Sequence, residues 1–231
     1  MNRVNDILTE YFDESFDVRR ALDFYVTNMG GLQRLQFVVP AQGVGGIAEP
    51  EYLKHLDKLI HWVEAQPKVS HARSFVDVVK RLNRSLHEGD QAYYSIPDNR
   101  ELIAQYILLY ELGLPFGLGL DTQVDMNKSE TKLEIVFERI HSDEIVMLRN
   151  AINQWIRTNW PDYMQASATG MDSLFSDITF ANVHSMIIGT IIALTLVSAL
   201  LIVSLGSVRY GLLSLLPNLL PAAMTFGVWG I

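Results

Sequence analysis

The chain has 231 residues, 26 acidic and 18 basic side chains, a formal net charge of −8 and no cysteine. Nucleic acid and anionic lipid headgroups repel an acidic chain, so we expect neither as its main partner. The lack of cysteine excludes disulfides, thiolate nucleophiles and Cys-ligated metals. Residues 183–231 contain no Asp, Glu or Lys and only one Arg, Arg209. The composition therefore predicts an acidic soluble body over 1–182, followed by a membrane body.

The N-terminal segment MNRVNDILTEYFDESFD, residues 1–17, has no apolar core of the kind that a signal peptide needs. Its run DESFD, residues 13–17, gathers carboxylates but lacks the ligand spacing of a calcium loop. A solvated helix is the favoured interpretation of this run.

The first of two βαβ-like units begins after this segment. Alternation of apolar and polar residues predicts a strand over 32–39, and helical spacing predicts a helix over 51–65 before a short strand over 69–74. The intervening loop GVGGIAEP, residues 43–50, lacks the Lys-Ser/Thr of a P-loop and the spacing of a dinucleotide site. We interpret this loop as a flexible connection.

A further helix is predicted over 98–113, with Asp98 as its N-cap and Glu101 three residues later. Its apolar residues cover more than one face, and the run is too short to cross a membrane. Leu102, Tyr106 and Tyr110 therefore have two interpretations. They pack in a protein core, or they line a path for an apolar substrate.

The second βαβ-like unit lies nearer the membrane body. Alternation predicts a strand over 131–139, apolar spacing predicts a helix over 142–159 with Ser142 as N-cap, and a last strand is expected near 163–169. Two such units pack as an α+β sandwich with helices on one face of a mixed sheet.

Motifs for catalysis and for metal binding are missing from the sequence. The six histidines have no HExxH spacing or other ligand spacing, and no serine lies in a GxSxG turn. We therefore expect no catalytic residues, no metal, no cofactor and no enzymatic activity.

The membrane body begins with a transmembrane helix over 183–208. Within it, 186–208 is 23 residues long without a formal charge, or ~34 Å of helix, enough to cross a hydrocarbon core of ~30 Å. A turn at Arg209 leads into a second uncharged helix up to 231, which contains Pro217 and Pro221. The two helices predict a transmembrane hairpin.

The basic residue in the turn favours the cytoplasmic side for Arg209. That orientation puts residues 1–182 outside the cytoplasm, although nothing in this sequence would carry them across the membrane. We therefore expect an additional transmembrane helix upstream and interpret the chain as an excerpt of a longer protein.

Several segments resemble the resistance–nodulation–division (RND) superfamily of exporters, and in particular its MMPL-like branch with the sterol-sensing-type membrane fold. In GSVRYGLLSLLPNLLPAAMTFGVWG, residues 206–230, the family pattern of a basic turn followed by P-N-x-x-P is matched by Arg209, Gly211, Pro217, Asn218 and Pro221. Gly206 departs from it, since the family often has Arg there. EPEYLKHLDKLIHWVEAQPKVSHARSFVDVVKRLN (49–83) and IPDNRELIAQYILLYELGLPFGL (96–118) look like the extracytoplasmic porter loop of that branch.

The resemblance implies part of a proton-driven exporter of hydrophobic or lipid-like molecules in the bacterial inner membrane, with 1–182 as a periplasmic porter domain. Its implied partners are the bilayer, an apolar substrate, the remaining helices and a second porter domain. In the family, acidic residues on the next membrane helix carry the proton. Residues 183–231 contain no carboxylate, so no proton-relay residue is assigned to this chain.

An alternative of a different class is a membrane-anchored periplasmic binding or adaptor protein, derived from a split transporter half. It differs from the exporter in needing no additional helices to fold. The sequence names neither the substrate nor the oligomeric state.

Overall fold

The computed structural model describes residues 12–115, 120–138, 140–213, 216, 217, 219, 220 and 224. These residues form two compact units, which divide between Ser176 and Asp177. The first unit is an α+β domain. The second contains most of a long apolar helix and the short helix that follows it.

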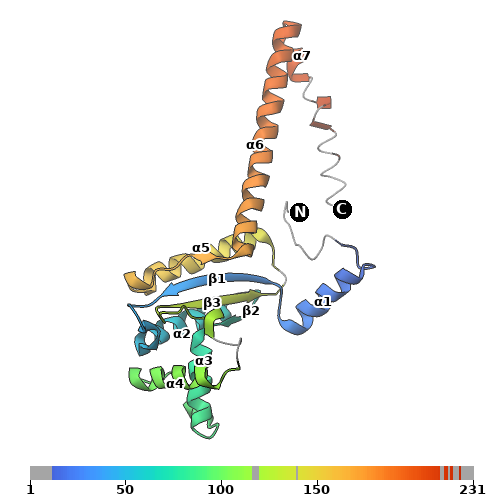
Figure 1. Cartoon of the computed structure of the whole chain (residues 1–231). Coiled ribbons are helices and arrows are strands. Elements are labelled where there is room, and N and C mark those ends of the chain that lie inside the picture. The colour runs from blue at the N-terminus through green and yellow to red at the C-terminus, as the bar shows by residue number, and fades with distance from the viewer. Residues whose placement is uncertain are drawn as a thin grey trace. The chain divides into compact units, whose positions relative to one another are not determined.

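The described part of the first unit is built on one sheet of four strands: β1 (Gln33–Pro40), β2 (Val69–Arg73), β3 (Glu130–Phe137) and β4 (Ala168–Thr169). Their order is β2-β3-β1-β4, and each neighbouring pair is antiparallel. Figure 1 shows β1, β3 and β2 side by side.

The prediction of a mixed sheet was wrong. β1 and β2 run in the same direction, but β3 lies between them, and β3 and β4 likewise flank β1. Both predicted βαβ-like units are present as split units, each with its two strands separated by a strand of the other. Interleaving places every strand beside an antiparallel neighbour.

Helices α2 (Pro50–Glu64) and α5 (Ser142–Asn159) cover the apolar face of the sheet. The rings of Trp62 and Trp155 stack with their centroids 5.9 Å apart, and the indole N–H of Trp160 donates to the carbonyl of His55 at 3.1 Å. The core behind these contacts includes Leu35, Phe37, Leu53, Leu56, Leu59, Leu133, Ile135, Ile152 and Ile156.

Between β2 and β3 the chain forms α3 (Phe75–Leu86) and α4 (Arg100–Gly113). Ser74 and Asp77 form a capping box at the start of α3. The Ser74 hydroxyl accepts from the Val76 N–H, and the Asp77 carboxylate accepts from the Ser74 N–H. The cap of α4 is Asn99, whose side chain accepts from the Leu102 N–H, and not Asp98 as predicted. The Asp98 carboxylate instead lies 2.8 Å from Lys54 Nζ.

The glycine-rich loop is a packed turn and not the flexible connection that was predicted. Its centre is a 3-10 helix, η2 (Gly46–Ala48), and the side chain of Ile47 is fully buried. The N–H groups of Gly45 and Ile47 donate to the carbonyls of Asn127 and Lys128. These bonds attach the loop to the turn before β3.

Three other helices lie nearer the ends of the chain. Helix α1 (Asp17–Met29) begins only at the last residue of DESFD, so most of that run precedes the helix. Helix α6 (Met171–Leu205) starts well before 183, where the membrane helix was predicted to begin. Gly206 then has a left-handed φ of 59°, which ends α6, and α7 (Val208–Leu213) follows.

One helix among the described residues, Met171–Ser204, is long and apolar enough to cross a membrane. The predicted turn at Arg209 lies earlier, at Gly206 and Ser207, and Arg209 belongs to α7. Much of the predicted second membrane helix lies outside the described residues.

Candidate functional site

The three residues predicted either to line a substrate path or to pack in the core all lie on α4. Tyr106 is buried, and its hydroxyl donates to Asn83 Oδ1 of α3 at 3.1 Å. The side-chain amide of Asn83 in turn donates to the carbonyl of Ser95 at 3.0 Å. Tyr110 packs against the core, and Leu102 is half-buried. Tyr106 thus joins α4 to α3, as the core-packing interpretation expects, whereas its part in a substrate path stays a prediction.

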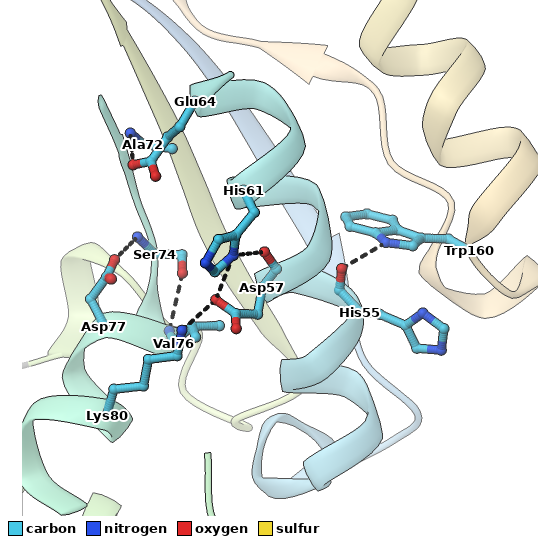
Figure 2. Close-up of polar contacts among 10 residues, drawn as sticks. All are labelled: His55, Asp57, His61, Glu64, Ala72, Ser74, Val76, Asp77, Lys80 and Trp160. Atoms are coloured by element: carbon cyan, nitrogen blue, oxygen red, sulfur yellow. Dashed lines mark hydrogen bonds and ion pairs between the residues drawn. The ribbon is translucent and has the colours of Figure 1, made fainter. Parts of the chain in front are cut away.

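An ion pair joins α2 to α3 on the same side of the sheet. Asp57 Oδ1 lies 2.6 Å from Lys80 Nζ, and these side chains are 23% and 12% exposed. His61 Nδ1 lies 2.8 Å from the Asp57 carbonyl oxygen and 3.5 Å from its carboxylate. Figure 2 shows Asp57 and Lys80 pointing toward one another, with His61 beside them.

The contacts around Asp57, Lys80 and His61 hold helices and a strand together. The hydroxyl of Ser74, also drawn in Figure 2, accepts a hydrogen bond from the Val76 N–H and caps α3. Glu64 accepts from the N–H of Ala72 and so ties α2 to β2. Among the described residues, no group of His, Asp or Glu side chains is arranged to hold a metal ion. We assign the network to the packing of α2 against β2 and α3.

The opposite face of the sheet carries a second, more unusual polar cluster. The carboxylate of Glu134 in β3 is only 10% exposed, yet its oxygens lie 3.1 Å from Arg34 Nη1 and 3.2 Å from Lys132 Nζ. Gln36 donates to the same carboxylate at 3.4 Å. A carboxylate with so little access to water needs such partners, because burial of an unpaired charge is costly.

His71 of β2 lies on this face too, opposite Val136. Burial and the nearby Arg73 lower the pKa of His71, while the charges of Glu64 and Glu134 act in the other direction. This face of the sheet therefore contains the buried Val136 and a buried carboxylate, Glu134, that is paired with basic side chains.

Arg34 also connects the sheet to α6. Its backbone N–H donates to Asp172 Oδ2 at 2.7 Å, and its guanidinium donates to the hydroxyl of Tyr25 in α1 at 3.3 Å. From α5, Arg149 donates to Ser173 Oγ at 3.1 Å. We call Arg34, Arg149, Asp172 and Ser173 the sheet–helix junction.

The junction fixes the first turn of α6 to a strand and to a helix of the α+β domain. Its groups are backbone N–H, guanidinium, carboxylate and hydroxyl, and each is used in holding another. These hydrogen bonds hold the first turn of α6 against β1 and α5. The junction is the candidate functional site of the described chain.

Sequence reasoning missed this junction, although part of it had a recognisable pattern. The alternation over 32–39 and 131–139 places Arg34 and Gln36, and also Glu134, on the polar faces of two strands. Antiparallel pairing with Gln36 directly opposite Glu134 brings these side chains together. Nothing local in the sequence pointed to Asp172 as a partner of β1.

The residues matched to the basic turn and proline helix are described only in part. Arg209 and Gly211 lie in α7, and Pro217 is an exposed helical residue. Asn218 and Pro221 lie outside the described residues. The proposed roles of all five in membrane topology stay predictions.

Neither models of known protein families nor curated proteins match this sequence.

Proposed function

We propose that the chain is part of a proton-driven membrane exporter of hydrophobic or lipid-like molecules, similar to the MMPL-like branch of the RND superfamily. The observation that carries the proposal is helix α6. It starts at the sheet–helix junction and continues without interruption through a stretch able to cross a membrane. A domain so joined to a membrane helix is suited to coupling movements in the bilayer to movements in the domain.

The architecture of the first unit supports this role. In a split-βαβ sandwich the two crossover helices cover one face of the sheet. Here the other face carries the Glu134 cluster and the contacts of β1 with α1 and α6. The Glu134 carboxylate pairs with the guanidinium of Arg34, whose backbone N–H donates to Asp172, and so supports the attachment of α6 to β1. In this proposal the first unit is a periplasmic porter domain, and the bacterial inner membrane holds α6.

The chain would supply the porter domain and the mechanical link, but not the proton pathway. Residues 183–231 contain no carboxylate, and a proton relay through a membrane needs a buried ionisable group. Additional membrane helices, from a longer form of the protein or from a partner, therefore have to carry the proton.

Deletion of the coding sequence in its host tests the proposal. We expect deletion cells to retain a fluorescent apolar probe more strongly than parent cells, and a protonophore should remove that difference. A plasmid copy should restore export, whereas a copy with Asp172→Ala should restore it poorly. Equal retention in deletion and parent cells would contradict the proposal.

A membrane-anchored periplasmic adaptor is the second candidate. It is favoured by the length and apolar character of α6, because one such span suffices for an anchor. The adaptor would bind its partner without a proton gradient. Probe retention that depends on the gene but is unaffected by the protonophore would favour the adaptor.

A further inference from the structure

One ring nitrogen of His71 is buried without a hydrogen-bond partner. Nδ1 of this ring lies 3.1 Å from Ser70 Oγ. Nε2 is buried, and no group among the described residues bonds to it. Buried polar atoms in folded proteins are nearly always hydrogen-bonded. The site therefore gives the ring one polar contact where its protonated form needs two, because both nitrogens of the imidazolium are donors.

A β-bulge sets the position of this ring. The register between β2 and β3 shifts between Val69 and His71, so that Ser70 is the extra residue of β2. A bulge changes the direction in which the neighbouring side chains point. His71 lies opposite Val136, whose side chain is only 2% exposed. The ring thus belongs to the covered part of the face that contains Glu134.

The turn between α1 and β1 packs directly on this ring. Gly30, the C-cap of α1, has a φ of 85°, and a Cβ placed on it would lie 2.8 Å from Ser70 Oγ and 3.1 Å from His71 Cε1. Gly31 has a φ of 127°, and a Cβ placed there would overlap the carbonyl oxygen of Phe137. Both positions favour glycine. His71 therefore forms part of the surface on which α1 ends.

Charged groups on four elements surround His71. Arg73 in β2 and Arg34 in β1 oppose a positive charge on the ring. The carboxylates of Glu64 in α2 and Glu134 in β3 favour one. Burial, followed by Arg73, lowers the pKa of His71 below its usual value of 6.5. The folded chain thus binds this proton less tightly than the unfolded chain, so stability falls as the pH drops from about 6.5 through the lower folded-state pKa.

Both carboxylates near the ring already have other partners. That of Glu134 lies 3.1 Å from Arg34 Nη1, and that of Glu64 accepts from the N–H of Ala72 at 3.1 Å. Tyr25 of α1, which reaches the same face, accepts from the guanidinium of Arg34 at 3.3 Å. A proton on the ring would therefore put a positive charge beneath the end of α1 without an acceptor for the second N–H. Such a charge is costly to bury.

We propose that His71 is an acid-sensitive switch in the attachment of α1: the neutral ring supports the α1–β1 turn on the sheet, and protonation of the ring releases the turn. All the residues involved belong to the first compact unit, so the switch requires neither export nor a proton pathway. In the periplasmic location of the proposed function, it would respond to acidity outside the cytoplasm. Failure of the export assay would leave the switch in place, and failure of the switch would leave export untouched.

Hydrogen exchange with mass spectrometry tests the switch on the full chain in mild detergent. Exchange is measured at about pH 7.5 and about pH 5, on either side of the usual histidine range, and corrected for the intrinsic effect of pH. We expect amides of 25–33 to exchange several-fold faster at the lower pH, while those of α5 change little. His71→Gln cannot take up the proton and should remove the difference.

His61→Gln is the matched control, because the His61 side chain is 70% exposed on α2. This variant should keep the full response to acid. A second variant, His71→Phe, replaces the ring by another planar ring without a titratable group and should respond as His71→Gln does. No acceleration in the parent chain, equal acceleration in α5, a response that persists in both His71 variants, or its loss in His61→Gln would each overturn the proposal.

Discussion

The backbone N–H of Arg34 donates to the carboxylate of Asp172 at 2.7 Å, which joins the first half of β1 to the first turn of α6. The two residues are 138 positions apart in the chain. One hydrogen bond to a charged acceptor thus connects the sheet to the helix that continues into the apolar segment. Charge-assisted bonds of this kind are stronger than neutral ones.

Replacement of Asp172 tests whether this bond holds the start of α6. Asp172→Ala removes the acceptor and should raise the amide exchange rate of Arg34 by roughly tenfold or more, since such bonds are worth about 1.5–3 kcal/mol. Asp172→Asn keeps an acceptor oxygen and should have a smaller effect. Hydrogen exchange with mass spectrometry on the detergent-solubilised chain measures both. Unchanged exchange in the alanine variant would show that the bond is dispensable.

Removal of the buried carboxylate should destabilise the sheet. Glu134→Ala leaves Arg34 and Lys132 without their shared partner and should lower the free energy of unfolding by about 1–3 kcal/mol. Urea titration of the full chain in mild detergent measures the change. The control is Glu51→Gln, which alters an ion pair whose carboxylate is 74% exposed and should change stability little. Equal losses in the two variants would contradict the assignment.

The hydroxyl of Tyr106 provides a test of core packing against substrate contact. Tyr106→Phe leaves Asn83 Oδ1 without its donor and should cost about 1–2 kcal/mol of stability. Tyr93→Phe is the matched control, because Tyr93 is 43% exposed. Unfolding is again followed by urea titration. Normal stability combined with altered probe export in Tyr106→Phe would favour the substrate path instead.

Glu144 should make stability depend on acid pH. Burial alone would raise its pKa, but the ammonium of Lys68 at 2.7 Å and the N–H of His141 at 3.1 Å outweigh burial, so the pKa lies below its usual value of 4.5. A carboxyl group with a lowered pKa in the folded state stabilises the protein above the unfolded-state pKa. That contribution is lost as the pH falls from about 4.5 through the lower folded-state pKa.

The variant Glu144→Gln should therefore lose stability at pH 7 and should show a smaller further loss between pH 5 and pH 3 than the parent chain. Urea midpoints at the three pH values measure this difference. Glu101→Gln, which changes an exposed carboxylate in the first turn of α4, serves as the control. Parallel pH profiles for Glu144→Gln and the parent would refute the effect.

Arg209 should influence membrane orientation. Arg209→Glu removes the only Lys or Arg side chain of 183–231 and should increase the fraction of inverted molecules, because Lys and Arg favour the cytoplasmic side. Reporter fusions placed after residue 209 measure the fraction, and Arg209→Lys is the control that keeps the charge. An unchanged orientation would mean that other segments set the topology.

The agreement between sequence and structure is closest where the determinants are local. The predicted helix over 142–159 coincides with α5, and that over 51–65 differs from α2 by one residue at each end. Helix α3 was not predicted, because its buried apolar residues, Phe75, Val76 and Val79, lie mainly in its first turns. Its capping pair, Ser74 and Asp77, was the overlooked local pattern.

The burial of Glu134 could not be predicted from local sequence patterns. Alternation assigned Glu134 to a polar face, which usually means a solvated position, yet its side chain is 10% exposed. Whether a polar face stays in water depends on what packs above it, and no single strand contains that information.

The apolar segment, the α+β composition of 1–182 and the positions of α2 and α5 follow from the amino-acid sequence alone, since length, charge and periodicity act over neighbouring residues. Three features became known only from the folded chain: β3 lies between β1 and β2, the buried Glu134 pairs with Arg34 and Lys132, and Asp172 accepts a hydrogen bond from Arg34. These features depend on contacts between residues far apart in the chain. Such contacts form only once strands and helices have packed, because their free energy comes from the completed core and not from local preference.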